Sequence, residues 1–406
     1  MEIEILSRET IRPTTPTQPH LRWHQLSALD QLAPLMTFHL VLFYPINDGD
    51  LSPPPHRETV LKISLSRLLT SFYPLAGRLR KEGPPPHGTA AVECTDEGVP
   101  FTVARADMDL DLVLQDDDRY LKHYDKLVSR DRCHIDYGEP LLHIQLTHFS
   151  CASSTLGICI AHQIADSSSL ALLLNEWSIS ARLSIIGPQL IPRFTAATIF
   201  PPVNPPPPDL VLPSYHRLHP RRFLIGARAL EQLREETTVR GAHARRPTRF
   251  EAAAGVVWRC ALRAREGLTN LYLVVNLRPR LSPPEGSDLF GNAWVMTATT
   301  TEEGIREALS MIDGEYARRV ISGEVRHDEV GSELVFSGVA RFGFYEADFG
   351  WGRPRRLGFA NHDSGELVMI AGTATGEGLE VWVWLEEEVM VRFERDPEIV
   401  GLVSHA

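Results

Sequence analysis

The sequence contains few cysteines, and their spacing points to neither a disulfide framework nor a metal site. There are five of them in a chain of 406 residues, which is an odd number, and they are scattered. None belongs to a C-x-x-C pair or to a cysteine and histidine array with metal-ligand spacing. We therefore predict a reducing compartment and no metal. The five are Cys94, Cys133, Cys151, Cys159 and Cys260.

Long apolar runs are also missing. The N-terminal segment MEIEILSRETIRPTTPTQPH carries acidic residues and has no apolar core of the kind found in a signal peptide. The most apolar later stretch, residues 32–46, is shorter than the roughly 20 residues that a membrane helix needs, and it contains Pro34 and His39. We expect a soluble cytoplasmic protein without a membrane partner.

Positive charge is in deficit. The chain has 41 lysines and arginines against 52 aspartates and glutamates, which gives a formal net charge of −11. A protein with this balance repels phosphates overall, so nucleic acid and anionic membrane surfaces are disfavoured as partners. A small anionic ligand could still bind where arginines gather locally.

Proline, by contrast, is abundant and breaks the chain in the middle. Residues 200–220, FPPVNPPPPDLVLPSYHRLHP, contain eight prolines, which leave many positions without a backbone N–H and favour extended geometry. We predict an N-terminal lobe over 1–195, a linker over 196–222 and a C-terminal lobe over 223–406. Residues 47–56 and 81–88, which are also rich in proline, are predicted to be surface loops.

Strand and helix patterns are interspersed in both halves. Apolar residues between Val60 and Phe72 follow a helical stripe, and 155–161 form a continuous apolar run that predicts a buried strand. A helix follows, with Ser167 or Ser168 as its cap. The second half predicts helices over 226–238 and 250–266, a strand over 270–278, and two strands with a helix over 365–393. The fold class is therefore α/β or α+β, with two lobes of similar size.

The first group of residues that could carry chemistry is His162-Gln-Ile-Ala-Asp166, between the predicted strand and the helix. A neutral imidazole can take a proton from an alcohol or amine near pH 7, and a strand-to-helix junction can project it into a cleft. The pattern H-x-x-x-D is common by chance, however, and alone it favours a structural histidine.

The second group is YEADFGWGRPRR, residues 345–356. Gly350 and Gly352 flank Trp351 close to Asp348, which predicts a tight loop with unusual backbone angles, stiffened by a buried ring and a charge. These residues by themselves indicate a structural turn.

Together the two patterns resemble the plant BAHD acyltransferases, which use acyl-coenzyme A thioesters and share H-x-x-x-D and D-F-G-W-G in this order. Further matches are LSALDQL at 26–32, FYPLAGRL at 72–79, DEGVPF at 96–101, NLRPRLSPP at 276–284 and FGNA at 290–293. The resemblance therefore covers almost the full chain. The segments at 12–34 and 157–177 are most similar to the branch that acetylates alkaloid and terpenoid alcohols.

This resemblance implies a fold and a reaction. Two lobes similar to chloramphenicol acetyltransferase are expected, each a mixed sheet with helices, with a tunnel between them and a monomeric state. The implied activity is acyl-CoA-dependent transfer, with acetyl as the expected group, to a hydroxyl of a plant specialised metabolite such as an alkaloid or terpenoid. His162 would be the general base in a ternary complex, without a covalent acyl-enzyme and without a tightly bound cofactor.

The resemblance also implies roles for other residues. Asp166 is expected to turn away from the acceptor and to pair with Arg278, so its role would be geometric. The loop with Asp348, Gly350, Trp351 and Gly352 would support the coenzyme side of the site. Arginines near this loop and in the C-terminal half are candidates for binding the phosphates of coenzyme A: Arg245, Arg246, Arg249, Arg353, Arg355 and Arg356.

One segment departs from the family pattern. Members usually have Phe-Thr-Ser-Trp shortly before D-F-G-W-G, with polar groups near the developing oxyanion in some of them, whereas this chain has Phe-Ser-Gly-Val at 336–339. Either Ser337 or a backbone N–H would then stabilise the oxyanion.

Three other readings stay open. The enzyme could acylate an amine or transfer an aroyl or hydroxycinnamoyl group. The replacement of tryptophan by Val339 also suggests a non-catalytic homologue that binds a metabolite. A carrier-protein-dependent condensation domain shares the histidine motif but would normally lack D-F-G-W-G.

Overall fold

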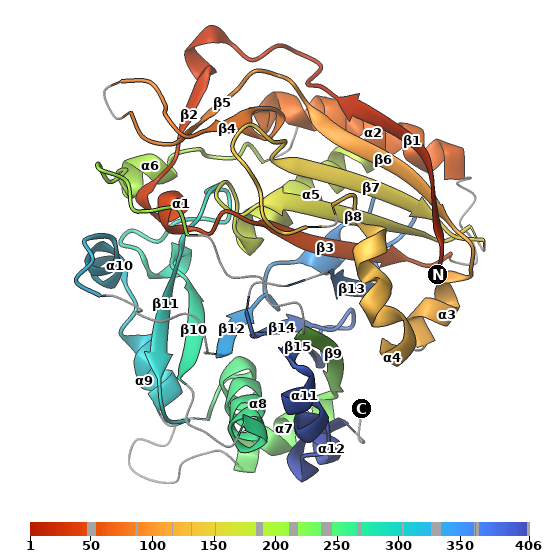
Figure 1. The fold of residues 1–406 in the computed structure, drawn as a ribbon, viewed down its shortest axis with the longest axis vertical. Coiled ribbons are helices and arrows are strands. Elements are labelled where there is room, and N and C mark those ends of the chain that lie inside the picture. Colours follow the sequence, from red (N-terminus) through yellow and green to blue (C-terminus); the bar gives the residue numbers. More distant parts are fainter. Residues whose placement is uncertain are drawn as a thin grey trace. The chain divides into compact units, whose positions relative to one another are not determined.

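In the computed structural model, the described part of the chain forms two six-stranded sheets and one three-stranded sheet (Figure 1). The structure describes residues 1–46, 54–85, 88–115, 117–130, 132–150, 152–183, 190–210, 218–236, 246–265, 270–302, 304–325, 334–360, 362 and 365–403.

The first sheet has the strand order β1-β6-β7-β8-β3-β13. Strands β6 and β7 are parallel, and the other neighbours are antiparallel. Every residue of β8 is buried, which is typical of a central strand with both faces covered, and the predicted strand at 155–161 is confirmed. The strands are β1 (Ile3–Ile11), β6 (Val99–Ala106), β7 (Leu142–His148), β8 (Ser154–Ala161), β3 (Thr37–Tyr44) and β13 (Arg356–Phe359).

Two long helices accompany this sheet, α2 (Pro54–Ser71) and α5 (Ser167–Leu183), and they pack against each other. The indole of Trp177 donates to the Ser64 hydroxyl at 2.9 Å between them. Shorter elements of the same part of the chain are α1 (Ala28–Leu32), α3 (Leu110–Gln115), α4 (Asp117–Tyr120) and α6 (Ala196–Ile199), with the small sheet of β2 (Trp23–Gln25), β5 (Ala91–Glu93) and β4 (Arg78–Arg80).

The second sheet has the order β11-β10-β12-β14-β15-β9. The central strand β12 is parallel to both neighbours, and the remaining pairs are antiparallel. Both large sheets are thus mixed, as the fold class predicted. The strands are β11 (Trp294–Thr299), β10 (Leu271–Asn276), β12 (Leu334–Gly338), β14 (Leu367–Gly372), β15 (Leu379–Glu386) and β9 (Leu218–Ile225).

Helices cover the second sheet with an apolar face. Trp258 of α8 (Arg249–Arg265) is buried in one cluster with Phe336 of β12 and Val383 of β15. The ribbons of α7, α8, α11 and α12 gather beside this sheet in Figure 1. The other helices are α7 (Ala227–Glu236), α9 (Gly304–Ser310), α10 (Gly314–Ile321), α11 (Glu387–Glu394) and α12 (Pro397–Val403).

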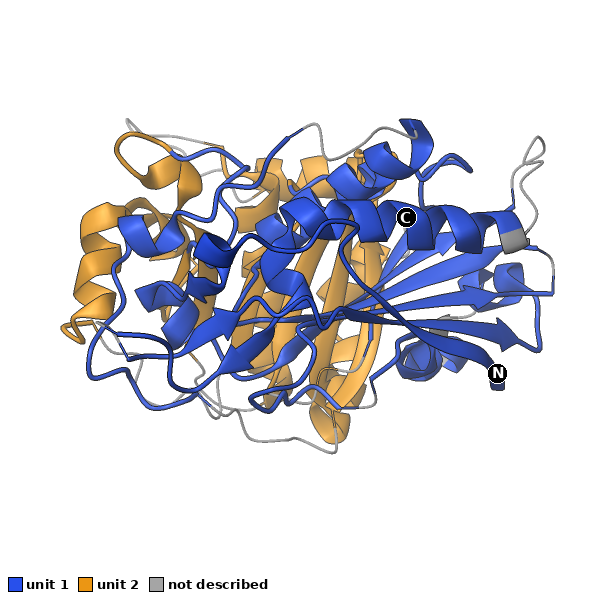
Figure 2. Ribbon diagram, turned by 90° about the horizontal axis from the view of Figure 1, so that it is seen from above, with its two compact units in different colours: residues 1–212, 285–293, 342–361 blue, residues 213–284, 294–341, 362–406 orange. Residues whose placement is uncertain are grey.

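The chain divides into two compact units whose segments alternate along the sequence (Figure 2). Unit 1 comprises Met1–Leu212, Glu285–Ala293 and Phe342–Asn361, and unit 2 comprises Pro213–Pro284, Trp294–Arg341 and His362–Ala406. The predicted lobes follow the order of the chain, so they assigned the D-F-G-W-G segment to the C-terminal lobe. In the structure this segment belongs to unit 1, because the adjacent β13 pairs with β3.

The predicted linker at 196–222 needs correction at both ends. It opens with the short helix α6, and its last residues begin β9, where Pro220 is tolerated because β9 is an edge strand. In between, the backbones of Val203 and Leu210 bond to Gln31 and Leu35. The predicted loop at 47–56 is also too long, since α2 begins at Pro54; residues 47–53 lie outside the described part of the chain.

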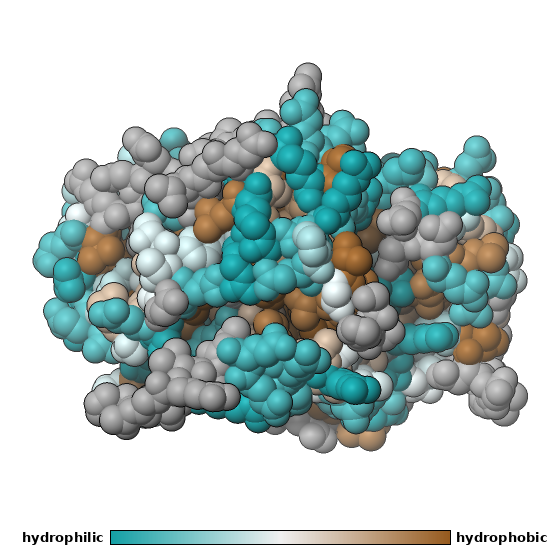
Figure 3. Space-filling model, turned by 90° about the horizontal axis from the view of Figure 1, so that it is seen from below, coloured by the Kyte–Doolittle hydropathy of each residue, from teal (hydrophilic) through white to brown (hydrophobic). Residues whose placement is uncertain are grey.

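The surface is largely hydrophilic on the face drawn in Figure 3, with hydrophobic residues in small separate patches. None of the helices in the described ranges combines the length and apolarity that a membrane span requires.

Candidate functional site

His162 lies directly after β8, in the turn that leads to α5. Its backbone N–H donates to the Met36 carbonyl at 2.7 Å. The next side chain, Gln163, donates from Nε2 to the Ala33 carbonyl at 3.5 Å. The turn is therefore tied to the segment between α1 and β3, and the position of His162 does not depend on the end of β8 alone.

Burial lowers the pKa of His162 below its ordinary value of 6.5 because desolvation disfavours the charged imidazole. Three weaker effects act in the opposite sense: a hydrogen bond with its own main chain, the negative charge of Asp166, and a hydrogen bond with the side chain of Asn292. The imidazole is consequently neutral at pH 7, which is the form that can accept a proton.

Asp166 caps α5, which corrects the prediction that a serine does so. Its Oδ1 accepts the backbone N–H of Ser169 at 2.9 Å, three residues into the helix. Its Oδ2 accepts the backbone N–H of Ala293 at 3.1 Å. The side chain is only 8% exposed, so one buried carboxylate joins the start of α5 to a segment far away in sequence.

That segment, Glu285–Ala293, is called the strap below, and it belongs to unit 1 although its neighbours in sequence belong to unit 2. Gly291 forms two hydrogen bonds with the Ser169 hydroxyl. The hydroxyl accepts from the Gly291 N–H at 3.0 Å and donates to the Gly291 carbonyl at 2.9 Å. Asn292 donates from Nδ2 to the His162 carbonyl at 2.7 Å. Gly291 has a φ of 128°, which L-residues with a side chain rarely adopt.

Asp30, in α1, accepts hydrogen bonds from Asn292 of the strap. Its Oδ1 accepts the N–H of Asn292 at 2.7 Å and the Nδ2 of Asn292 at 2.8 Å. Its Oδ2 accepts the N–H of Ser27 at 2.9 Å and the hydroxyl of Ser27 at 2.7 Å. Asp30 is 1% exposed, and desolvation raises its pKa, against the effect of these four donors.

The other end of the strap is anchored by Arg193. Its N–H donates to the Asp288 carbonyl at 2.8 Å, and its carbonyl accepts from Phe290 at 3.0 Å. Its guanidinium pairs with Asp288 and, at 2.5 Å, with Glu285. The strap is therefore held at both ends within unit 1.

The Asp348–Gly352 loop has the tight backbone that the sequence predicted. Gly350 and Gly352 have φ values of 107° and 99°. Asp348 Oδ1 accepts the N–H of Gly350 at 2.8 Å and that of Gly352 at 3.0 Å. The ring of Trp351 stacks on Phe349, and the guanidinium of Arg57 lies 5.4 Å from the centre of the indole ring. These contacts belong to unit 1 and give the motif a structural role there.

Arg278 and Ser337 lie in unit 2. Arg278 is 2% exposed, and both its N–H and its Nη1 donate to Asn276 Oδ1, at 3.1 and 3.3 Å. Its ion pair with Asp166 stays a prediction. Ser337 is a half-buried residue of β12. The N–H of Val339 donates to the Ile370 carbonyl at 2.9 Å, so that N–H is not available to an oxyanion.

The candidate phosphate-binding arginines have partners within the protein. In unit 2, Arg246 pairs with Glu231 at 2.6 Å, and Arg249 donates to backbone carbonyls of Gly376–Gly378. In unit 1, Arg353 pairs with Glu346 at 2.5 Å, and Arg355 pairs with Asp111 at 3.9 Å. Arg356 donates to the Leu114 carbonyl at 2.7 Å. Arg245 lies outside the described residues. Their role towards coenzyme A stays a prediction.

The four cysteines that the structure describes are buried, and Cys151 lies outside the described residues. Burial raises the pKa of Cys94 and of Cys159 to about 12. It also raises the pKa of Cys260. These thiols are protonated at pH 7 and therefore poor nucleophiles.

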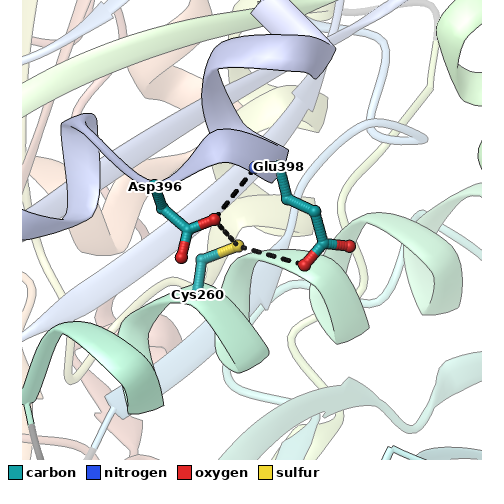
Figure 4. Close-up of side chains that lie close together, drawn as sticks. All are labelled: Cys260, Asp396 and Glu398. Atoms are coloured by element: carbon teal, nitrogen blue, oxygen red, sulfur yellow. Dashed lines mark hydrogen bonds between the residues drawn. The ribbon is translucent and has the colours of Figure 1, made fainter.

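Cys260 on α8 forms a cluster with Asp396 and Glu398 (Figure 4), with Sγ 3.5 Å from an Asp396 oxygen. Arg263 donates to both carboxylates, at 2.7 Å to Asp396 and 2.6 Å to Glu398. Because a guanidinium already neutralises these oxygens, we interpret the cluster as an anchor between α8 and α12 rather than a cation site.

Sequence reasoning did not single out Asp30 or Asn292. Both lie in segments that match the family, LSALDQL and FGNA, but their long-range partners leave no trace in local patterns. The one local signal is the spacing of Ser27 and Asp30, which predicts the capping box that the structure contains.

Comparisons with known proteins agree over the whole chain. The family model described as "Transferase family" matches residues 1–400. Stemmadenine O-acetyltransferase from Catharanthus roseus is 30% identical over 422 residues, covering 97% of each chain. Vinorine synthase from Rauvolfia serpentina is 30% identical over 431 residues, covering 99% of this chain and 98% of that protein.

The structural comparison points the same way. The crystal structure of vinorine synthase matches with a TM-score of 0.83 at 28% identity, covering 99% of this chain and 98% of that chain. F. graminearum TRI101, solved with coenzyme A and T-2 mycotoxin, matches with a TM-score of 0.75 at 17% identity, covering 94% and 98% of the two chains. At that identity the second likeness concerns the fold alone.

Proposed function

The chain belongs to the Transferase family, the BAHD acyltransferases that its motifs resemble, and we propose that it transfers an acetyl group from acetyl-CoA to a hydroxyl of a plant alkaloid or terpenoid. It is an acyltransferase whose relatives are O-acetyltransferases of specialised metabolism. The observation that carries the proposal is the match over residues 1–400, with His162 and Asp166 in place.

In the proposed mechanism His162 is the general base. Its neutral imidazole takes the proton from the acceptor hydroxyl while that oxygen attacks the thioester carbonyl. The tetrahedral intermediate then expels the sulfur of coenzyme A, which receives the proton from the imidazolium. The lowered pKa of His162 supports this role because it keeps the imidazole neutral and able to accept the proton. A general base of this kind contributes roughly 10²–10⁴-fold to the rate.

We propose direct transfer in a ternary complex. A covalent acyl-enzyme on cysteine would need a thiolate, and the raised pKa values of Cys94, Cys159 and Cys260 oppose it. Asp166 would act by geometry, since its two oxygens bind the backbone of α5 and the strap.

Ser337 is the proposed donor to the oxyanion. The alternative is a backbone N–H, and the N–H of Val339 cannot serve because it donates to Ile370 of β14. Removing one such donor from an acyl-transfer site typically costs about 10²–10³-fold in rate.

Free thiol release measures the reaction directly. The purified protein is incubated with acetyl-, malonyl-, benzoyl- or coumaroyl-CoA and pooled plant alcohols or amines, and the thiol is titrated with an Ellman-type reagent. We expect release with acetyl-CoA only when alcohols are present. The matched control is His219→Ala, a half-exposed histidine on the edge strand β9, which should retain activity while His162→Ala loses it.

The other readings give distinct results. Release with amines alone would indicate N-acylation, and release only with benzoyl- or coumaroyl-CoA would indicate an aroyl transferase. Silence with every donor, while coenzyme A still raises the melting temperature, would contradict the proposal and favour the non-catalytic homologue.

A further inference from the structure

His162 is held through its main chain by two opposite segments of unit 1. Its N–H donates to Met36 at 2.7 Å, and its carbonyl accepts from Asn292 at 2.7 Å. These two hydrogen bonds restrain the peptide planes on either side of the His162 Cα, and with them the direction of its Cα–Cβ bond. Asn292 and Met36 therefore help to fix the point from which the imidazole extends.

The amide of Asn292 is itself oriented. One hydrogen of Nδ2 points at Asp30 Oδ1 at 2.8 Å and the other at the His162 carbonyl at 2.7 Å. Both partners are acceptors, so flipping the amide would place its oxygen against two oxygens. Asn292 is fully buried, and no bulk water is present to compensate for such a flip.

Asp30 determines that orientation. Four donors surround its carboxylate, two from Asn292 and two from Ser27, and a carboxylate with only donors around it is an acceptor on every side. The Ser27 contacts fix its own position, because they close the capping box of α1. A rigid sequence of contacts thus runs from α1 through the strap to the residue proposed as the base.

We propose that Asp30 and Asn292 are positioning residues of the transfer reaction, which hold the main chain of His162 so that its imidazole stays aligned for proton transfer. This inference rests on the proposed function. It assigns no contact with substrate to either residue. A displacement of a catalytic group by about 1 Å can cost on the order of 10²-fold in rate.

The test measures kcat and KM of the single variants Asn292→Ala, Asp30→Ala and Asp30→Asn, and of a double variant that combines Asp30→Ala and Asn292→Ala. The substrates are acetyl-CoA and an acceptor identified by the thiol-release assay. For Asn292→Ala and Asp30→Ala we expect kcat to fall about 10- to 100-fold while KM changes less than about threefold. The double variant should lose no more than the worse single variant, because both act through one contact. Asp30→Asn keeps an acceptor oxygen for Asn292 and should recover part of kcat.

A pH profile separates positioning from general loss of structure. Asn292→Ala removes the side chain that raises the pKa of His162, with the charge of Asp166 left in place, so the acid limb of kcat/KM should move to lower pH. The control is Asp396→Asn in unit 2, which removes the charge of a carboxylate that is 8% exposed and should leave kcat and the acid limb unchanged.

The outcomes are distinguishable. If wild type is active and His162→Ala is not, but folded Asn292→Ala and Asp30→Ala keep kcat within threefold, the positioning role is wrong and the proposed function stands. If the two losses in kcat multiply in the double variant, the positioning role of Asp30 and Asn292 is also wrong. Should Asn292→Ala fail to melt cooperatively, the comparison of Asp30→Asn with Asp30→Ala decides, since equal loss in both contradicts the inference. An active His162→Ala would instead overturn the proposed function.

Discussion

His162 can work as a base only while its imidazole is neutral, and its burial favours that form. Protonation switches the proposed mechanism off, so the rate should follow the fraction of neutral imidazole. Since desolvation outweighs the charge of Asp166 and lowers the pKa below 6.5, this fraction persists to lower pH than for an exposed histidine.

The acid limb of kcat/KM should therefore lie below pH 6.5. Initial rates with acetyl-CoA across about pH 5 to about pH 8, in buffers of constant ionic strength, measure it. The assay must be brief enough for the enzyme to stay folded, which circular dichroism at each pH checks. An acid limb above pH 6.5 would contradict the described environment of His162.

Asp166 should affect stability as well as rate. Asp166→Ala removes the cap of α5 and the bond to Ala293, and two buried N–H groups lose their partner. We expect the free energy of unfolding to fall by about 2–4 kcal/mol. Urea unfolding measures this change, and Asp107→Ala is the control because the N–H that Asp107 accepts from Glu2 is exposed. Equal stability of both variants would contradict the structural role of Asp166.

At the residue scale, the sequence could predict His162 and Asp166 because they share one turn. It could not predict that Asn292 bonds to both His162 and Asp30, because 262 residues separate Asn292 from Asp30 and nothing local distinguishes either residue. The serine cap of α5 was wrong for a simpler reason: an aspartate at position 166 is an equally good cap and precedes both serines.

At the scale of elements, the Asp348–Gly352 loop is shaped by backbone geometry. Gly350 has a φ of 107°, yet a Cβ at this position would meet nothing within 4 Å. Any cost of a side chain there is consequently conformational and not steric.

Gly350→Ala should lower the free energy of unfolding by about 1–3 kcal/mol despite the open space. Gly401→Ala is the control for open space, since a Cβ there also meets nothing within 4 Å and its φ is not in the positive range. Because Gly401 lies inside α12, this substitution should leave the free energy of unfolding unchanged or raise it. Urea unfolding followed by circular dichroism compares the two variants with wild type. A Gly350→Ala variant as stable as wild type would show that the loop does not require a positive φ.

Hydrophobic periodicity predicted most long elements, including β8, α7 and α8, because each buries one continuous apolar run or stripe. It failed at the proline-rich segments. Pro54 stands in the first helical turn of α2 and Pro220 on an edge strand, two positions where the missing N–H does no harm.

At the scale of the whole molecule, the alternation of segments between the units has a consequence for folding. Unit 1 contains the strap and β13, both from the second half of the chain. These pairings join residues hundreds of positions apart, so the sequence predicted two lobes but not which segments each contains.

Residues 1–212 expressed alone should therefore not form a cooperatively melting unit, because they lack the strap around Asp166 and β13, one of the two strands that pair with β3. Coexpression with residues 213–406 should restore melting close to that of the full chain. Thermal melts followed by circular dichroism provide the comparison. Cooperative melting of 1–212 alone at the temperature of the full chain would contradict the described units.

The measurement that tests the central proposal most directly is the turnover of His162→Asn, with acetyl-CoA and an accepted alcohol at saturation. Asparagine retains polarity but cannot act as a base near pH 7. We expect kcat to fall at least about 10²-fold, with a melting temperature close to that of wild type. A folded variant that retains kcat within about tenfold would show that another group removes the proton.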